Sequence, residues 1–210
     1  MQNPLLLHPP EHGTGVKICG LMDEASIDVA LVAGADAIGF VFAQGSPRLI
    51  ERNRASQLML QLPDAVLGIA VLQNYPSIDD FNDWDGWIQM CGDEDEDVIA
   101  AAPRPVIRAF KWSKDAVIRW DCCPDVQALL VDGSTGGLGR SFDVAELAEM
   151  IPTLSTPIII AGGLTPENVA SVISLAHPTA VDVSSGVELS PGIKDPQRIR
   201  DFIKQVRQTT

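Results

Sequence analysis

Two side chains that can exchange protons close short apolar runs in this sequence. Cys19 ends the run Val16-Lys-Ile-Cys19, just before a glycine, and Asp132 ends the run Leu129-Leu-Val-Asp132. A thiol becomes a useful base when its pKa is lowered or when it meets an acidic substrate proton. Each residue also has an ordinary interpretation, since most cysteines at strand ends are inert and Asp-Gly is a common turn. The sequence therefore offers a candidate base and a candidate acid.

Two later apolar runs stop abruptly at glycine and small hydroxyl residues. They are Pro157-Ile-Ile-Ile-Ala-Gly-Gly-Leu164 and Ala180-Val-Asp-Val-Ser-Ser-Gly-Val-Glu188. Glycine lets the backbone approach an anion closely, serine adds a hydroxyl donor, and a helix N-terminus favours negative charge. The pattern predicts a phosphate site. Its donors would come from Gly162, Gly163, Ser184, Ser185 and Gly186.

Three further segments carry charge or unusual flexibility. Arg48, in Ser46-Pro-Arg48, could make a bidentate contact with a carboxylate, although a solvated surface arginine is the simpler alternative. The segment Gly133–Arg140 has the glycine density of a mobile flap, or of an ordinary loop. We interpret Asp93-Glu-Asp-Glu-Asp97 as the solvated first turn of a helix rather than a metal site.

The scaffold that would bring these residues together is a parallel β-barrel. Eight short apolar runs, rich in β-branched residues, begin near Val16, Ala37, Val66, Trp87, Val106, Ala128, Pro157 and Ala180. Their starts lie 19 to 29 residues apart, which suits a strand, a crossover helix and two loops. We therefore expect an α/β protein with a (β/α)8, or TIM-barrel, fold. In that fold, active sites lie at the carboxyl ends of the strands, and phosphate sites recur after strands seven and eight.

Helical patterns between the runs support this fold unevenly. Ala55, Leu58, Met59 and Leu62 form one apolar stripe before a proline. Thr165-Pro166-Glu167 and Asp195-Pro196 each read as an N-cap followed by a first-turn proline. The segment Asn74–Gly86 consists largely of turn formers, so we expect the third crossover helix to be reduced to a turn.

Length and charge limit the organisation and the partners. The chain has 210 residues, and we expect one barrel domain over residues 16–207 after a flexible arm over residues 1–15. A net charge of −13 opposes binding to nucleic acid or to an anionic membrane. No apolar run approaches the roughly 20 residues that span a bilayer. The first 15 residues contain no Lys or Arg, which argues against a signal peptide.

The four cysteines indicate a reducing compartment. Cys19, Cys91, Cys122 and Cys123 show no CxxC spacing, and two of them are adjacent. That arrangement fits neither a disulfide framework nor a zinc site. We therefore expect a cytoplasmic protein.

Several motifs in the same order resemble phosphoribosylanthranilate isomerase, a barrel enzyme of tryptophan biosynthesis. The likeness runs from about Val16 to Phe202. The motifs are Lys17-Ile-Cys-Gly20, Gly34-Ala-Asp-Ala-Ile-Gly-Phe-Val-Phe42 with Ser-Pro-Arg48, Asp132, Gly162-Gly-Leu-Thr-Pro-Glu-Asn168 and Val181-Asp-Val-Ser-Ser-Gly-Val-Glu188.

The resemblance implies an aldose–ketose isomerase, formally an intramolecular oxidoreductase, that performs an Amadori rearrangement. Asp132 would be the general acid that opens the sugar ring, and Cys19 the base that removes the C2 proton. Arg48 would contact the anthranilate carboxylate, Gln89 and Asp182 would line the pocket, and the two glycine–serine loops would bind phosphate. The resemblance implies a small phosphosugar substrate, no metal and no organic cofactor. We expect a monomer or a homodimer.

One departure from the family pattern leaves alternatives open. The family usually has Gln-Leu-His-Gly at the fourth strand, where this chain has Gln89-Met-Cys91-Gly92. If that histidine shapes the pocket, Cys91 would weaken activity or change the substrate. A non-catalytic or substrate-altered phosphosugar-binding barrel is therefore one alternative, although Cys19 and Asp132 argue against lost catalysis. The histidine-pathway aminoaldose isomerase is a second, but it resembles a two-carboxylate design. A barrel with another reaction is the third.

Overall fold

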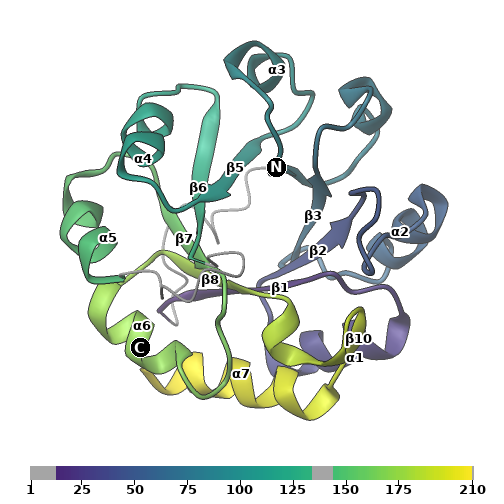
Figure 1. The fold of residues 1–210 in the computed structure, drawn as a ribbon. Coiled ribbons are helices and arrows are strands. Elements are labelled where there is room, and N and C mark those ends of the chain that lie inside the picture. The colour runs from purple at the N-terminus through teal and green to yellow at the C-terminus, as the bar shows by residue number, and fades with distance from the viewer. Residues whose placement is uncertain (1–12, 134–143, 210) are drawn as a thin grey trace.

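The computed structural model describes residues 13–133 and 144–209, and it forms a closed eight-stranded parallel barrel ringed by helices (Figure 1). Each strand pairs with the next, and β8 pairs with β1. The predicted TIM-barrel fold is confirmed. The strands are β1 (Gly15–Cys19), β2 (Ala37–Val41), β3 (Leu67–Leu72), β4 (Trp87–Met90), β5 (Val106–Lys111), β6 (Val126–Asp132), β7 (Ile158–Ala161) and β8 (Ala180–Val183).

Alternation along the strands divides the core into two layers. One face of each strand packs against the helices, in a cluster that includes Ile18, Phe40 and Ile160. The other face fills the barrel, where Ile69, Trp87, Ile107 and Ile159 form a second cluster. Near the carboxyl ends of the strands, the inward residues become small or polar. The inner face therefore closes at one end of the barrel and opens into a polar mouth at the other.

The helices that cover the barrel are short, except for the last. They are α1 (Glu24–Ala33), α2 (Arg52–Met59), α3 (Glu96–Ala100), α4 (Lys114–Asp121), α5 (Val144–Met150), α6 (Val169–Ala176) and α7 (Pro196–Thr209). The 3₁₀-helices are η2 (Ile78–Phe81), η3 (Ile151–Thr153) and η4 (Ser185–Val187). In the third crossover only η2 is present, as the turn-forming sequence predicted. Figure 1 shows α7 beside α1, where both pack on the barrel wall.

Helix starts agree with the sequence in one case and differ in another. Asp195 accepts hydrogen bonds from the first-turn amides of α7, and Ile199, Phe202, Ile203 and Val206 are buried as expected. In α6, Thr165 caps as predicted, because its hydroxyl accepts from Glu167 N–H at 3.2 Å and its carbonyl oxygen accepts from Val169 N–H at 3.1 Å. The regular helix begins only at Val169 and not at Pro166, after a turn in which the Asn168 side-chain oxygen accepts from Thr165 N–H at 2.8 Å.

The acidic run at residues 93–97 was only partly interpreted correctly. Asp95 is the N-cap of α3 and accepts a hydrogen bond from Val98 N–H, as a first-turn acid should. Glu94 is not solvated, because its side chain is 7 % exposed and pairs with Arg108 at 3.1 Å. The stripe expected through Leu62 packs on the core, but α2 itself stops at Met59, before Leu62.

Two short strands follow β8 and complete the mouth. They are β9 (Glu188–Ser190) and β10 (Ile193–Lys194), which pair antiparallel. Among the described residues, no helix is long and apolar enough to cross a membrane. Within residues 13–133 and 144–209, no group of three or more His, Cys, Asp or Glu side chains could hold a metal ion. The arm predicted for residues 1–15 lies outside the described residues up to residue 12, and Gly15 already belongs to β1.

Candidate active site

A cavity of about 390 Å³ lies at the carboxyl ends of the strands. Its wall takes residues from β4, β5 and β6 on one side and from the loops after β7 and β8 on the other. It contains eight of the residues that the sequence suggested for a site: Gln89, Asp132, Gly162, Gly163, Asp182, Ser184, Ser185 and Gly186. The remaining two, Cys19 and Arg48, lie beside it and not in its lining.

Cys19 lies in the inner layer of the barrel, next to the cavity floor. It is 7 % exposed and belongs to the same interior cluster as Ala109, Leu130 and Ala161, which line the cavity. Gly39 on β2 makes room for it, because a Cβ there would stand 2.9 Å from the Cys19 sulfur. The thiol is thus held just below the space that a ligand would occupy.

A buried lysine shares that space with the thiol. Lys17 and Cys19 are two residues apart on β1 and therefore point to the same side of the strand. Lys17 is fully buried, and its Nζ lies 2.7 Å from Asp182 Oδ1. A Cβ added to Gly39 would also stand 3.2 Å from Lys17 Nζ. The ammonium group of Lys17 and the sulfur of Cys19 therefore both lie next to Gly39 of β2.

Opposing effects act on the ionisation of this pair. Burial raises the pKa of the Cys19 thiol, and the charge of Asp182 adds to the rise, while the ammonium groups of Lys17 and Lys194 lower it. Burial alone would lower the pKa of Lys17, but the charges of Asp182 and Cys19 outweigh it and raise the pKa. Lys17 therefore stays charged and stabilises a thiolate beside it.

Asp132 is the last residue of β6 and lines the cavity. Its backbone oxygen accepts a hydrogen bond from Trp112 N–H at 3.0 Å, which fixes the strand end. On β7, its register partner is Ala161, another residue of the cavity wall. The carboxyl group is half-buried and faces the space above the Cys19 layer.

The loops after β7 and β8 meet at one edge of the cavity. A Cβ on Gly186 would stand 1.8 Å from the Leu164 carbonyl oxygen, so only glycine permits this contact between the two loops. Gly186 and Ser185 lie in the first turn of η4, where backbone N–H groups have no acceptor within the helix. Within the described part of the chain, the N–H groups of Gly163, Ser185 and Gly186 donate no hydrogen bond. The loops thus present free donors to an anion.

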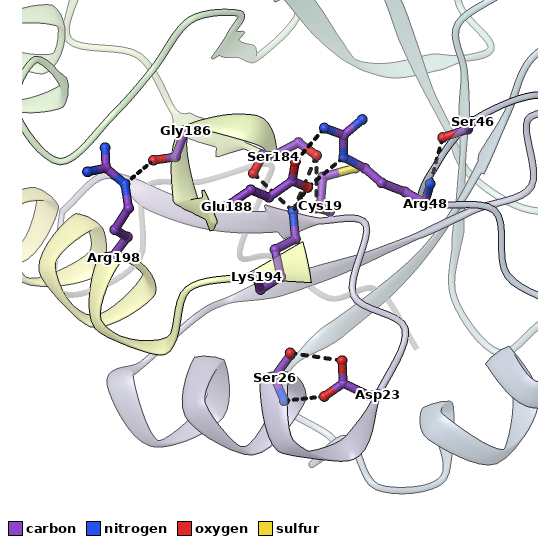
Figure 2. A network of polar contacts seen from close by, with 10 residues as sticks. All are labelled: Cys19, Asp23, Ser26, Ser46, Arg48, Ser184, Gly186, Glu188, Lys194 and Arg198. Atoms are coloured by element: carbon purple, nitrogen blue, oxygen red, sulfur yellow. Dashed lines mark hydrogen bonds and ion pairs between the residues drawn. The ribbon is translucent and has the colours of Figure 1, made fainter. Parts of the chain in front are cut away.

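Arg48 lies on the β2 side of the mouth, where it is paired within the chain and partly exposed. Its Nε and Nη2 donate to the two carboxylate oxygens of Glu188 at 2.7 Å each (Figure 2). The pKa of Arg48 is raised, chiefly by these hydrogen bonds. The bidentate geometry expected from the sequence exists, but its partner in this structure is a glutamate of the chain itself.

The position of the unusual cysteine is on the wall formed by β4. Cys91 donates from its sulfur to the Leu72 carbonyl oxygen at 2.9 Å, and burial, followed by the charge of Glu94, raises its pKa to about 12. It is therefore a neutral thiol. Gln89 is 5 % exposed, and its side-chain oxygen is buried without a hydrogen-bond partner in the described part of the chain. That oxygen is therefore an unused acceptor inside the barrel wall.

Some residues of the mouth were missed at the level of sequence. Lys17 could have been found, because it precedes Cys19 by two positions on a strand. The roles of Glu188 and Lys194 could not, since Arg48 and Glu188 are 140 residues apart. Gln73 and Lys111, which also line the cavity, carry no signal beyond their places near strand ends.

The fold and this mouth define the class as a (β/α)8-barrel enzyme with an acid, a thiol and an anion-binding edge around one cavity. Residues 16–205 match the family described as N-(5'phosphoribosyl)anthranilate (PRA) isomerase. A relative named N-(5'-phosphoribosyl)anthranilate isomerase, from Acidithiobacillus ferrooxidans, is 39 % identical over 92 % of this chain and 98 % of its own. The chain belongs to the phosphoribosylanthranilate isomerase family.

Solved structures agree with that assignment. The phosphoribosyl anthranilate isomerase from Thermus thermophilus has 31 % identity and a TM-score of 0.82, and the match covers 94 % of this chain and 100 % of that one. A second isomerase was solved in complex with reduced 1-(o-carboxyphenylamino)-1-deoxyribulose 5-phosphate. It has 30 % identity and a TM-score of 0.82, with 93 % of this chain and 99 % of that chain covered.

Proposed function

We propose that this chain is a phosphoribosylanthranilate isomerase of tryptophan biosynthesis. It converts N-(5-phosphoribosyl)anthranilate to 1-(2-carboxyphenylamino)-1-deoxyribulose 5-phosphate. The change is an internal oxidation and reduction, because C2 goes from alcohol to ketone while C1 gains hydrogen, and the composition stays the same. The observation that carries the proposal is the single mouth at which Asp132, Cys19 and the two anion-binding loops meet.

Asp132 begins the reaction as a general acid. It protonates the ring oxygen, and the nitrogen lone pair opens the ring to a Schiff base at C1. The half-buried carboxyl group stands at the end of β6, where it can reach a sugar in the cavity. Proton transfer from a positioned side chain contributes typically about 10²- to 10⁴-fold to a rate.

Cys19 then removes the C2 proton, which the adjacent iminium makes acidic. The resulting enolamine takes up a proton at C1 and releases the proton of the C2 hydroxyl, which yields the ketoamine. Burial makes the Cys19 thiolate a strong base once it forms, and Lys17, held by Asp182, stabilises the negative charge. We therefore assign Asp182 to positioning this lysine. Since only the thiolate acts, the rate should rise with pH toward the pKa of Cys19.

Binding groups occupy the two ends of the substrate. The phosphate lies against Gly162, Gly163 and the Ser184–Gly186 turn, where the N–H groups of Gly163, Ser185 and Gly186 are free to donate. The anthranilate carboxylate reaches Arg48, and Gln89 lines the cavity between the two ends. The neutral Cys91 thiol forms part of the cavity wall and adds no charge to it.

Turnover of N-(5-phosphoribosyl)anthranilate, generated in situ, tests the proposal. The purified protein should abolish the anthranilate-type fluorescence of the substrate and form a product of unchanged mass that carries a ketone. Folded protein that leaves the substrate intact at every pH tested would refute the proposed activity. If that protein still bound the reduced product analogue, the non-catalytic or substrate-altered alternative would replace it.

A further inference from the structure

The β9–β10 hairpin brings two buried charged residues to the mouth. It packs against the segment that carries Arg48, since a Cβ on Gly192 would stand 2.4 Å from the Pro47 carbonyl oxygen. Glu188 begins the hairpin and Lys194 ends it, and their side chains are 4 % and 1 % exposed. Burying two charged groups costs free energy unless they are paired and hydrogen-bonded, so their partners matter.

Glu188 is the centre of the cluster. Its Oε1 accepts from Arg48 Nε at 2.7 Å and from Lys194 Nζ at 2.8 Å, and its Oε2 accepts from Arg48 Nη2 at 2.7 Å (Figure 2). Burial would raise the pKa of Glu188, but the hydrogen bonds from Arg48 and Lys194 outweigh it and hold the pKa below its usual range. Glu188 is therefore an ionised carboxylate shared by two cations.

Lys194 connects this centre to the loop after β8. Its Nζ donates to the Ser184 carbonyl oxygen at 3.0 Å and lies 3.4 Å from the Ser184 hydroxyl. That hydroxyl donates to the Cys19 carbonyl oxygen at 3.1 Å. Figure 2 shows the continuous path from Arg48 through Glu188 and Lys194 to Ser184 and the end of β1. The carboxylate-binding and phosphate-binding ends of the site are thus joined by one set of contacts.

The charges of the cluster do not cancel. Arg48 and Lys194 bring two positive charges, and Glu188 brings one negative charge, so the three residues carry a net charge of +1 in a chain of net charge −13. Within the described residues, Nη1 of Arg48 donates no hydrogen bond. The cluster therefore keeps a fixed donor and one uncompensated positive charge for an anion.

We propose that Glu188 and Lys194 are positioning residues for substrate binding. Glu188 fixes the Arg48 guanidinium so that its unused edge meets the substrate carboxylate. Lys194 neutralises the charge that Glu188 brings and holds the Ser184 turn in register with it. The inference rests on the proposed function, because it takes the anthranilate carboxylate as the ligand of Arg48.

Steady-state kinetics of Glu188→Gln and Glu188→Asp test the role of Glu188. The first removes the charge, and the second keeps it but shortens the reach by one methylene. Each should raise KM for phosphoribosylanthranilate about tenfold, the order expected for a lost charged hydrogen bond, and change kcat less than threefold. If Glu188 instead competed with the substrate for Arg48, Glu188→Gln would lower KM, and that result would overturn the proposal.

A double-mutant cycle with Arg48→Ala separates positioning from a purely structural role. If Glu188 acts through Arg48, adding Glu188→Gln to Arg48→Ala should raise KM no more than about twofold further. Independent, multiplicative effects in the double variant would contradict the proposal, as would a lowered melting temperature with KM unchanged. Lys194→Met should raise KM about tenfold, because the net positive charge is lost.

The parent enzyme provides the control for the underlying activity. If the parent does not turn over phosphoribosylanthranilate, the proposed function fails first, and the kinetic test is replaced by binding of the reduced product analogue. In that case, Glu188→Gln should weaken the analogue's Kd about tenfold. Unchanged or tighter binding of the analogue would overturn the positioning role independently of catalysis.

Discussion

Two arginine–glutamate pairs lie near the carboxyl ends of the strands, and they differ in how much of the guanidinium they leave accessible. Arg108 and Glu94 are each 7 % exposed at the side chain, and the Arg108 guanidinium also donates to the carbonyl oxygens of Met90 and Gly92. It stacks on Trp120, 4.8 Å from the ring centre. This pair is closed: Nη1 and Nη2 of Arg108 donate to the protein, one face of the guanidinium lies on Trp120, and the unused Nε is buried out of reach of a ligand.

The Arg48–Glu188 pair has the same chemistry but an open edge. The Arg48 side chain is 21 % exposed, and its two hydrogen bonds to Glu188 use only one edge of the guanidinium. Both arginines keep an unused nitrogen, but only that of Arg48 belongs to a side chain that solvent reaches, so accessibility and not composition separates the two pairs. We therefore expect Arg108 to serve stability, and the role proposed for Arg48 is binding.

Breaking the closed pair should have the largest effect on stability. Arg108→Met leaves Glu94 buried without its cation, which costs about 3–5 kcal/mol. In a chain of this size, that corresponds to a melting temperature lower by about 6 to 20 °C, measured by differential scanning fluorimetry. The control is Arg108→Met combined with Glu94→Gln, which removes the uncompensated charge and should recover part of the loss. A melting temperature unchanged in the single variant would show that the closed pair contributes nothing.

Breaking the open pair should change binding and leave folding nearly intact. Arg48→Ala removes a charge-assisted contact to the substrate carboxylate, so KM should rise about 10- to 100-fold with kcat little changed. The melting temperature should fall far less than in Arg108→Met, because Glu188 keeps Lys194 as a partner at 2.8 Å. A large drop in melting temperature with KM unchanged would show that Arg48 serves stability and not binding.

Cys91 lies beside Glu94 of the closed pair, and its burial should make the stability of the protein depend on pH. Burial, then the charge of Glu94, raises the pKa of Cys91 from 9.0 to about 12. The folded protein therefore keeps this proton at pH values where the unfolded chain has lost it. That contribution to stability is complete below about pH 9 and is lost as the pH rises toward 12.

Urea unfolding of the parent and Cys91→Ala between pH 8 and about 11 would measure this contribution. The unfolding free energy of the parent should fall more steeply than that of Cys91→Ala, by up to one proton, or about 1.4 kcal/mol per pH unit. Parallel curves would mean that the thiol ionises in the folded state as it does in the unfolded one.

How much the sequence could predict depends on how local each signal is. The eight strands follow from short apolar runs at regular spacing, and the caps of α7 follow from Asp195 and Pro196. Thr165 also caps the start of α6 as predicted, but the regular helix begins only at Val169, after a turn closed by the Asn168 side chain. Local patterns suffice for elements and caps, but the exact start of a helix depends on the contacts within its first turn.

The residues suggested for the site could also be recognised from local sequence, but the residues that pair with them could not. Cys19 and Asp132 could be chosen because each ends an apolar run before a glycine. That Glu188 pairs with Arg48, or that Glu94 is buried, depends on contacts between distant strands. No spacing in the sequence distinguishes the open pair from the closed one.

In the mechanism proposed for this site, Asp132 and Cys19 exchange protons with one substrate. Single-turnover conversion of phosphoribosylanthranilate by the parent, Asp132→Asn and Cys19→Ser tests it most directly, with circular dichroism melting as the control for folding. We expect conversion by the parent and rates about 10²- to 10⁴-fold lower in each variant, at melting temperatures close to that of the parent. Near-parental conversion by either folded variant would contradict the role of that residue.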